Sequence, residues 1–345
     1  MLGAGATSAE ADVQTTTQAS LGQGVVATAT RDLGVLANSV TSGDTAASGV
    51  YLGLIAGGSN EALTKADTTT TAQVGQGVNL SATRALSVNA TGSDTLRADT
   101  EAGAGGLGAL LASKAETRAE AHTNAALGSL TASGGQATAG SVQVNATQTT
   151  NFNATADSLN ASVVGYSGAR AVNTVDTDTR ADIGQGMTVT ASNGSVQVKA
   201  INHVVKQALA SGEFNVDSAS GGLLNGAAAR SQSLIRNRAH VGVGAGSNVT
   251  VNIPGSTYGQ IELGALNHVD AHDSVRLDSG GAIAIARSES EIRNDLNRAE
   301  VLIGASAQLK TDGEVNASAR TDAKVFTEAR SKTYGLAGAA EGETL

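Results

Sequence analysis

The stretch Arg180-Ala181-Asp182-Ile183-Gly184-Gln185-Gly186 decides the fold, because variants of it return along the whole chain. Each copy is marked by an aliphatic residue, usually followed directly by glycine, and the marker residues stand at positions 21, 74, 127, 183, 241 and 301. By subtraction these positions advance by 53, 53, 56, 58 and 60 residues, just above the usual range for solenoid and propeller repeats. We therefore interpret residues 1–345 as one repetitive array without an internal domain boundary.

A second landmark has the same period. It reads Val-x-Ala or a close variant and occurs at residues 35–37, 88–90, 144–146, 198–200, 263–265 and 315–317. Its positions advance by 53, 56, 54, 65 and 52 residues. The one long step contains the segment Asn252–Gly259 with the only proline of the chain, which we interpret as a loop insertion of about ten residues in one unit.

The composition limits both the core and the partners. The chain contains 43 Gly, one Pro, no Cys and no Trp, and 2% of its residues are aromatic. With so few large side chains, we expect a thin core in which two backbone layers approach closely. The formal net charge of −9 argues against nucleic acid as a partner. The lack of cysteine excludes disulfides and thiol chemistry.

The start of the sequence does not resemble a signal peptide. Residues 1–4 lack the basic start and the apolar core of a signal peptide, and the sequence contains no apolar run long enough to span a membrane. The chain opens partway through one unit and stops at Tyr334–Gly338, a segment type that elsewhere precedes the marker. We therefore expect a fragment of a longer repeat protein, with self-association end to end or continuation into further repeats as its partner relationship.

Within each unit the side chains alternate with a period of two. Between residues 114 and 122, small residues occupy the odd positions and charged residues the even ones, and residues 227–236 and 284–293 repeat a similar pattern. A helix would require a period of 3.6, although the alanine and glutamate of this stretch favour one. The alternation therefore predicts strands throughout.

Repeated strands without helical crossovers stack on their own copies as parallel ladders about 4.8 Å apart. The fold class that we predict is all-β, a flattened, wide parallel β-solenoid of about six coils of 53–60 residues. Each broad side would hold roughly 20 to 25 residues. A competing interpretation divides each unit into two ordinary coils of roughly 26 residues. Serine ladders would place Ser231 over Ser288 and Ser233 over Ser290.

The repeating motifs resemble those of giant bacterial surface exoproteins and adhesins, broadly the filamentous-haemagglutinin-like β-solenoid group. The shared pattern reads A-x-V/I-G-x-G, then V-x-V-x-A, then a run rich in Ser, Thr and Asn, then G-L-x-A-G, and it covers nearly the whole chain. This resemblance implies secretion, a stalk or filament at the cell surface, and adhesive or matrix roles. The positions that carry it are Ile183, Gly184, Gly186, Val196, Val198 and Ala200 with their counterparts, and none of them is catalytic.

Few residues suggest site chemistry. His268, Asp270 and His272 are spaced by two, so on a strand they project from one face, opposite Val269 and Ala271, and could bind a divalent transition metal or form a solvated polar row. The aspartates at 176, 178 and 182 share a parity and could hold calcium or form a solvated face. The glycines of the markers are predicted to be turns, not phosphate loops: Gly22, Gly24, Gly75, Gly77, Gly128, Gly184, Gly186, Gly242, Gly244 and Gly304.

Three functions compete. A structural or adhesive extracellular filament needs only repetition, and requires neither a cofactor nor an active site. A β-helix protein that binds or cleaves polysaccharide would need an unmatched cluster of carboxylates and basic residues on one coil. An ice-binding solenoid would need regular Thr-x-Thr pairs, which begin at Thr15 and Thr68 and then decay. If a cell-surface or glycan ligand binds, the insertion with Tyr258 is the place that we expect for it.

Overall fold

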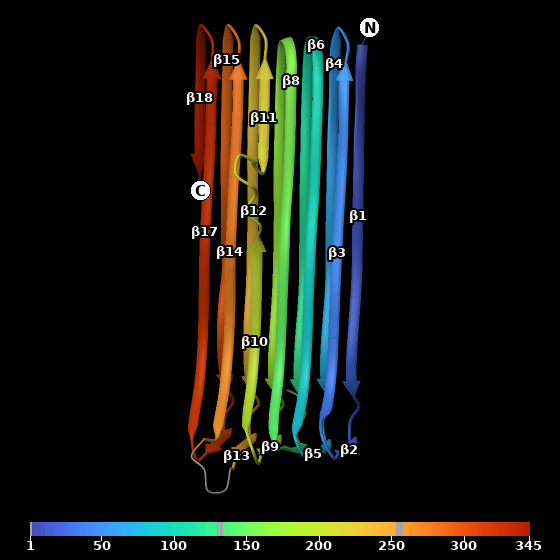
Figure 1. Ribbon diagram of the computed structural model, residues 1–345, viewed down its shortest axis with the longest axis vertical. Helices are drawn as coiled ribbons and strands as arrows, with labels where there is room; N and C mark the ends of the chain where they lie inside the picture. The colour runs from blue at the N-terminus through green and yellow to red at the C-terminus, as the bar shows by residue number, and fades with distance from the viewer. Residues whose placement is uncertain (1, 130, 132–133, 253–257) are drawn as a thin grey trace.

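The computed structural model describes residues 2–129, 131, 134–252 and 258–345, which form long parallel strands joined by tight turns. Figure 1 shows these strands side by side in two layers, with the N-terminal strand at one edge of the stack and the C-terminal strands at the other. The all-β class and the parallel stacking predicted from the sequence are confirmed. The alanine-rich stretch around residue 115 is strand and not helix.

One repeat follows a closed path. Strand β3 (Leu33–Leu52) runs along the first layer, and β4 (Ile55–Val74) returns along the second. The Gly-x-Gly corner and the short strand β5 (Asn79–Ala82) then lead back to the first layer. Two strands, β6 (Ala85–Leu127) and β8 (Ser141–Ile183), continue through the far turn and belong to both layers.

The other strands fall into three groups. The first layer also contains β10 (Ser195–Lys206), β11 (Val216–Gly221), β14 (Gln260–Gly280) and β17 (Glu314–Tyr334). The second layer also contains β1 (Leu2–Leu21), β12 (Leu224–Val243), β15 (Ile283–Ile303) and β18 (Ala337–Thr344). The short strands of the corner are β2 (Val26–Ala29), β5, β7 (Gln136–Ala139), β9 (Thr188–Ala191), β13 (Asn248–Val251) and β16 (Gln308–Thr311), and they form a sheet of their own.

The register of the ladders links each strand to the strand one repeat away. Leu2 pairs with Ile55, and Ile55 pairs with Gly108, so both steps are 53 residues long. Coils of roughly 26 residues would instead pair residues half a repeat apart. The pairing therefore favours one wide turn per repeat. A broad side of such a turn is a strand of 20 or 21 residues, as in β3, β4 and β14, or an equivalent half of a longer strand.

The register corrects three sequence assignments by two residues. Val243, not residue 241, pairs with Ile183, and Ile303 pairs with Val243. Gly242, predicted as a turn, therefore lies inside β12, and Gly244 takes the corner position. Residue 263 pairs with residue 317, not 315, and Ser231 lies beside Ser290 while residue 233 lies beside Ile292. A slip of two residues preserves the alternation of faces, so periodicity alone does not detect it.

The long step in the second landmark contains two insertions, not one. Ten positions separate Lys206 from Val216, whereas four separate their partners Phe152 and Ala156, so about six residues are inserted between β10 and β11. Ten positions separate residue 251 from 261, whereas five separate residues 191 and 196, so the second insertion is about five residues and not ten. Residues 253–257 lie outside the described residues. We call residues 207–215 the excursion, because they leave the broad face in mid-strand.

The interior is thin, as the composition predicts. Around the Gly-x-Gly corner it is aliphatic, with buried residues such as Leu80, Met187 and Val189. Between the broad layers it consists largely of alanine, threonine, serine and asparagine, and hydrogen bonds cross from one layer to the other. Asn202 Nδ2, for example, donates to Thr177 Oγ1 at 2.7 Å. Small polar side chains thus hold the two layers close together.

The two glycines of each marker are required for different physical reasons. A Cβ added at Gly184 would lie 2.5 Å from the backbone carbon of Gly128, because neighbouring turns approach closely at this corner. Gly186 has a φ of 63°, in the left-handed region that favours glycine. Glycines 24, 77 and 246 have φ values between 64° and 69° at the same position, and Ser306 adopts 60° there. The first glycine permits close stacking, and the second permits the turn.

Candidate functional site

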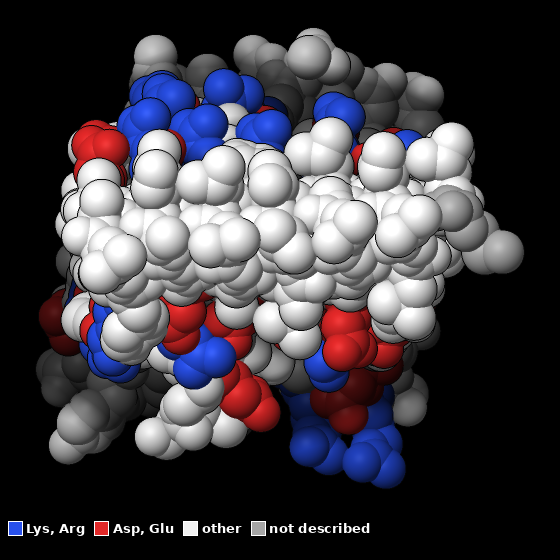
Figure 2. Space-filling model, turned by 90° about the horizontal axis from the view of Figure 1, so that it is seen from above, with Lys and Arg blue, Asp and Glu red and all other residues white. Residues whose placement is uncertain are grey.

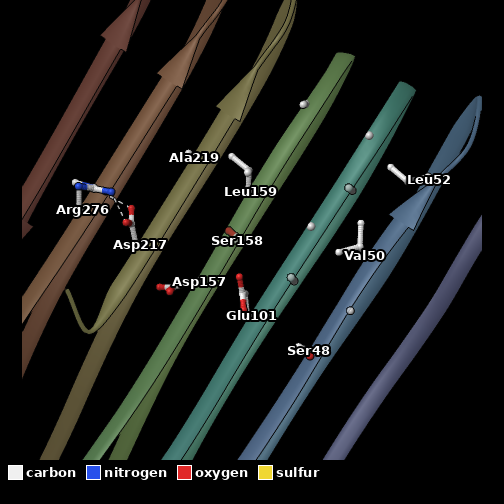
Figure 3. A pocket seen from close by; sticks show the side chains of 16 residues that line it. Ser48, Val50, Leu52, Glu101, Asp157, Ser158, Leu159, Asp217, Ala219 and Arg276 are labelled. Atoms are coloured by element: carbon white, nitrogen blue, oxygen red, sulfur yellow. Dashed lines mark hydrogen bonds and ion pairs between the residues drawn. The ribbon is translucent and has the colours of Figure 1, made fainter. Parts of the chain in front are cut away.

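A groove of about 780 Å³ lies on the first layer, close to the turns that join the two layers (Figure 3). It crosses β3, β6, β8 and β11. Outward-facing Gly103 on β6 lies between Val50 and Leu159 in the ladder. Because glycine has no side chain, the row of outward side chains is interrupted at β6. Gly105 repeats this arrangement one step further along, beside Leu52. We call this hollow the front groove.

One wall of the front groove is a row of charged residues. Glu101, Asp157, Asp217 and Arg276 occupy equivalent positions on four neighbouring strands, as Figure 3 shows. Adjacent strands are about 4.8 Å apart, so three carboxylates stand in direct succession. Arg276 closes the row: its Nε donates to Asp217 Oδ1 at 3.0 Å, and its guanidinium lies 4.9 Å from the ring centroid of Phe214. We call this set the acidic row.

The acidic row changes the protonation of its central member. Loss of solvation, together with the charges of Asp217 and Glu101, raises the pKa of Asp157 to about 6. Asp157 is exposed at the surface, so solvent screens part of this effect. Around pH 6 the row can therefore both accept hydrogen bonds through its carboxylates and donate one through Asp157.

An exposed apolar strip borders the front groove. It follows the turns between the two layers from one repeat to the next, and Figure 2 shows it as a white ridge with charged residues on both sides. Its members at the turn are 38% to 96% exposed and include Leu54, Leu107, Val163, Leu223 and Leu336. A second hollow of about 660 Å³, with few polar atoms, lies beyond it on the second layer and is lined by Ile55, Leu110 and Tyr166 among others. We call this strip the apolar ridge.

The predicted histidine row lies on β14. His268, Asp270 and His272 all face outward and are half-buried, while Val269 and Ala271 are buried, as the alternation predicts. They do not converge, since alternate residues of a strand are about 6.6 Å apart. Each instead contacts the neighbouring strand β17. His268 Nδ1 lies 3.5 Å from Asp322 Oδ2, and Asp270 Oδ2 lies 3.9 Å from Lys324 Nζ. The His272 ring packs edge-on against the Phe326 ring, with 4.5 Å between the ring centroids.

The predicted aspartate row is also dispersed. Asp182 is buried and lies 3.5 Å from His240 Nε2, whose other ring nitrogen hydrogen-bonds Glu300 at 3.0 Å. Burial raises the pKa of Asp182, and the hydrogen bond with His240 lowers the pKa of Glu300. Within the described ranges, no three His, Cys, Asp or Glu side chains are grouped so that they could hold a metal ion. The metal assignment of both rows stays a sequence-based hypothesis.

The sequence-based reasoning placed the irregular region at Tyr258 and overlooked the excursion. Tyr258 is 87% exposed, next to the residues that are not described. The excursion lies on the broad face and, with His272 and Arg330, lines a hollow of about 330 Å³. The acidic row was also missed, although residues 101 and 157 are 56 positions apart, like the second landmark in these two repeats, and aligning them would have revealed the first pair. The excursion shifts residue 217 out of that alignment. The row spans repeats, so no local motif marks it.

No protein family, curated protein or solved structure matches this chain. In the part of the chain that the structure describes, no helix is long and apolar enough to cross a membrane.

Proposed function

We propose that the chain is a structural or adhesive extracellular repeat protein that forms a stalk, filament or matrix at a bacterial cell surface. The proposal includes about six coils in this array and its extension by further coils, of the same chain or of another copy. It is supported by the parallel ladders, in which each repeat already serves as the template for the next. The role needs no cofactor, and we propose no catalytic activity.

The observation that carries this proposal is the environment of Gly22. At its counterparts Gly75, Gly184 and Gly244, an added Cβ would lie 2.5 to 2.8 Å from backbone atoms of the preceding turn. At Gly22 no described atom lies within 4 Å of the same Cβ. The close-approach glycine is thus present at a corner where nothing approaches. A further turn stacked on β1 and β2 would supply the missing neighbour.

Substitution of Gly22 tests the proposal. Gly22→Val would leave a dilute single chain folded, because its side chain has open space, but it would block a turn stacked on that corner. The assay is sedimentation and electron microscopy at increasing protein concentration. Gly221→Ala is the matched control, since its Cβ also meets no described atom within 4 Å but lies within the array. Filaments that form equally well with Gly22→Val would refute end-to-end stacking.

The front groove favours a second candidate function, the binding of polysaccharide. Its carboxylates can accept hydrogen bonds from sugar hydroxyls, and Val50, Leu52 and Leu159 provide an apolar wall. Because the row is acidic, we expect a neutral or amino-sugar polymer and not an acidic one. The Thr-x-Thr pairs, by contrast, do not support ice binding, because Thr68 and Thr70 face inward and are buried.

Filling the front groove tests this second candidate. A Cβ at Gly103 would meet only the Val50 side chain, at 3.4 Å, so Gly103→Leu fills the hollow without a backbone clash. Calorimetric titration with chitosan oligosaccharides should show binding to the native chain and loss of binding in Gly103→Leu. As a separate variant, Glu101→Gln should also weaken binding if the acidic row takes part. Equal binding by Gly103→Leu would exclude the groove as the site.

A further inference from the structure

A lysine and an aspartate lie in contact inside the array. Lys206 is the last residue of β10, directly before the excursion, and Asp273 lies on β14 of the next repeat. Both side chains are 0% exposed. Lys206 Nζ donates a hydrogen bond to Asp273 Oδ1. This pair is independent of the front groove and of the proposed filament.

The pair is enclosed by apolar side chains and by hydrogen bonds from the opposite layer. Along the strands it lies between two apolar clusters, with Val204 and Ala271 on one side and Val216 and Val275 on the other. From the opposite layer two serines reach the carboxyl group: Ser231 Oγ donates to Oδ1 at 2.7 Å, and Ser290 Oγ donates to Oδ2 at 2.6 Å. The carboxyl group is therefore held in one orientation with its lysine neighbour in contact.

An ion pair would satisfy these groups poorly. A lysine ammonium has three N–H donors, and in the described hydrogen bonds Nζ makes one, to Asp273. Buried donors without acceptors and buried charges are costly, and such pairs contribute to stability only when the remaining hydrogen bonds are made. An amide between the two side chains would carry no charge, a single N–H and one carbonyl oxygen, which a serine hydroxyl already faces.

We propose that Lys206 Nζ and Asp273 Cγ are joined by an intramolecular amide bond, an isopeptide cross-link that forms after folding. The ammonium first passes a proton to the carboxylate, which leaves a neutral amine and a neutral carboxylic acid. The nitrogen lone pair then attacks Cγ, the C–N bond forms, and one C–O bond breaks. The departing oxygen leaves as water with a proton from the nitrogen. Ammonium and carboxylate thus yield amide and water, and no external reactant is consumed.

The environment favours both steps. Burial lowers the pKa of Lys206, although Asp273 opposes this shift, so the neutral amine is more accessible than in water. Contact within a rigid interior replaces a bimolecular encounter, the condition under which intramolecular reactions have high effective molarity. The Ser231 and Ser290 hydroxyls are aimed at the oxygens on which charge develops during the attack. The product would connect β10 to β14 beside the excursion, where the strand is interrupted.

The mass of the intact native chain decides the proposal. We expect a mass lower than that of the sequence by one water molecule. Trypsin digestion of the unfolded protein should release residues 200–230 covalently joined to residues 239–276, because acylated Lys206 is not cleaved. A mass equal to that of the sequence, after prolonged incubation of the folded protein, together with cleavage after Lys206, would show an ion pair only and overturn the proposal.

Two variants separate the cross-link from other losses of water. Lys206→Met removes the amine while keeping the length of the side chain, and it should restore the full sequence mass. Lys199→Met is the control: Lys199 lies on the same strand, forms a half-buried surface ion pair with Glu262, and should leave the water loss intact. Because the native chain alone settles the mass, failure of Lys206→Met to fold would not affect the conclusion. Water loss that persists in Lys206→Met would assign it to another site and refute the proposal.

Discussion

The close-approach glycine of the marker makes a quantitative prediction about the stacking of the repeats. A Cβ at Gly184 would lie 2.5 Å from both the Gly128 carbon and the Ser129 nitrogen, so the turns must separate by about 0.9 Å locally to reach an ordinary contact near 3.4 Å. The obstructing atoms are backbone, and no rotamer change can move them. Overpacking of this kind costs about 1–3 kcal/mol. The reduced entropy of the unfolded chain returns about 0.4–1 kcal/mol. We expect Gly184→Ala to destabilise the array by about 1–2 kcal/mol.

The matched control is Gly22→Ala, the same position of the marker without a neighbouring turn. In dilute solution it should change the free energy of unfolding by no more than about 0.5 kcal/mol. The assay is urea unfolding followed by far-ultraviolet circular dichroism, which reports the strands directly. Partial unfolding near residue 184 would appear as a second transition, because repeat arrays need not unfold in two states. Equal destabilisation by both variants, or none by Gly184→Ala, would refute the close-approach argument.

Three further predictions follow from single side chains. Phe152 is 1% exposed, so Phe152→Ala should cost about 3–5 kcal/mol in urea unfolding, whereas Phe326→Ala, which removes a 51% exposed ring, should cost far less; similar losses would contradict the assigned core. The raised pKa of Asp157 means that its contribution to stability is present below about pH 3.8 and lost as pH rises through about 6. Asp157→Asn should therefore be more stable than the native chain at pH 7, by about 1 kcal/mol or less because the residue is exposed, and the difference should vanish near pH 4. Asn215 Nδ2 donates to Asn153 Oδ1 at 2.6 Å in the interior, so Asn215→Ala should cost about 1–3 kcal/mol; an unchanged urea midpoint would show that the excursion is anchored elsewhere.

The wide parallel array could be predicted from the sequence because its signals are local and repeated. The marker around Gly184 sets the repeat length, and the alternation around Ala115 sets which side chains face inward. Both signals recur for a physical reason, since the close approach at the corner requires glycine and the interior between the layers is built mostly from small residues. Asn202 and Thr177 illustrate the second condition, because a larger side chain at either position would push the layers apart.

The register in later repeats could not be obtained in the same way. The run Val241-Gly242-Val243-Gly244 offers two equivalent alignments that differ by two residues, and both keep the same faces inward. Only the pairing of Val243 with Ile183 decides between them. The two insertions were merged for a related reason, because the landmark spacing measures their total length and not their positions. The acidic row was missed because Glu101, Asp157 and Asp217 come from three different repeats and lie side by side only in the folded ladder.

The excursion connects the features that sequence reasoning missed. Phe214, near its end, packs under the Arg276 guanidinium, which in turn holds Asp217 at the end of the acidic row. Directly before it, Lys206 points into the interior and meets Asp273. An insertion of about six residues thus lies between the Arg276 end of the charged row outside and the Lys206–Asp273 pair inside. Because a regular ladder makes every turn alike, any ligand specificity of this array has to arise where one turn differs. The excursion is a place where the described surface and interior both differ from those of the neighbouring turns.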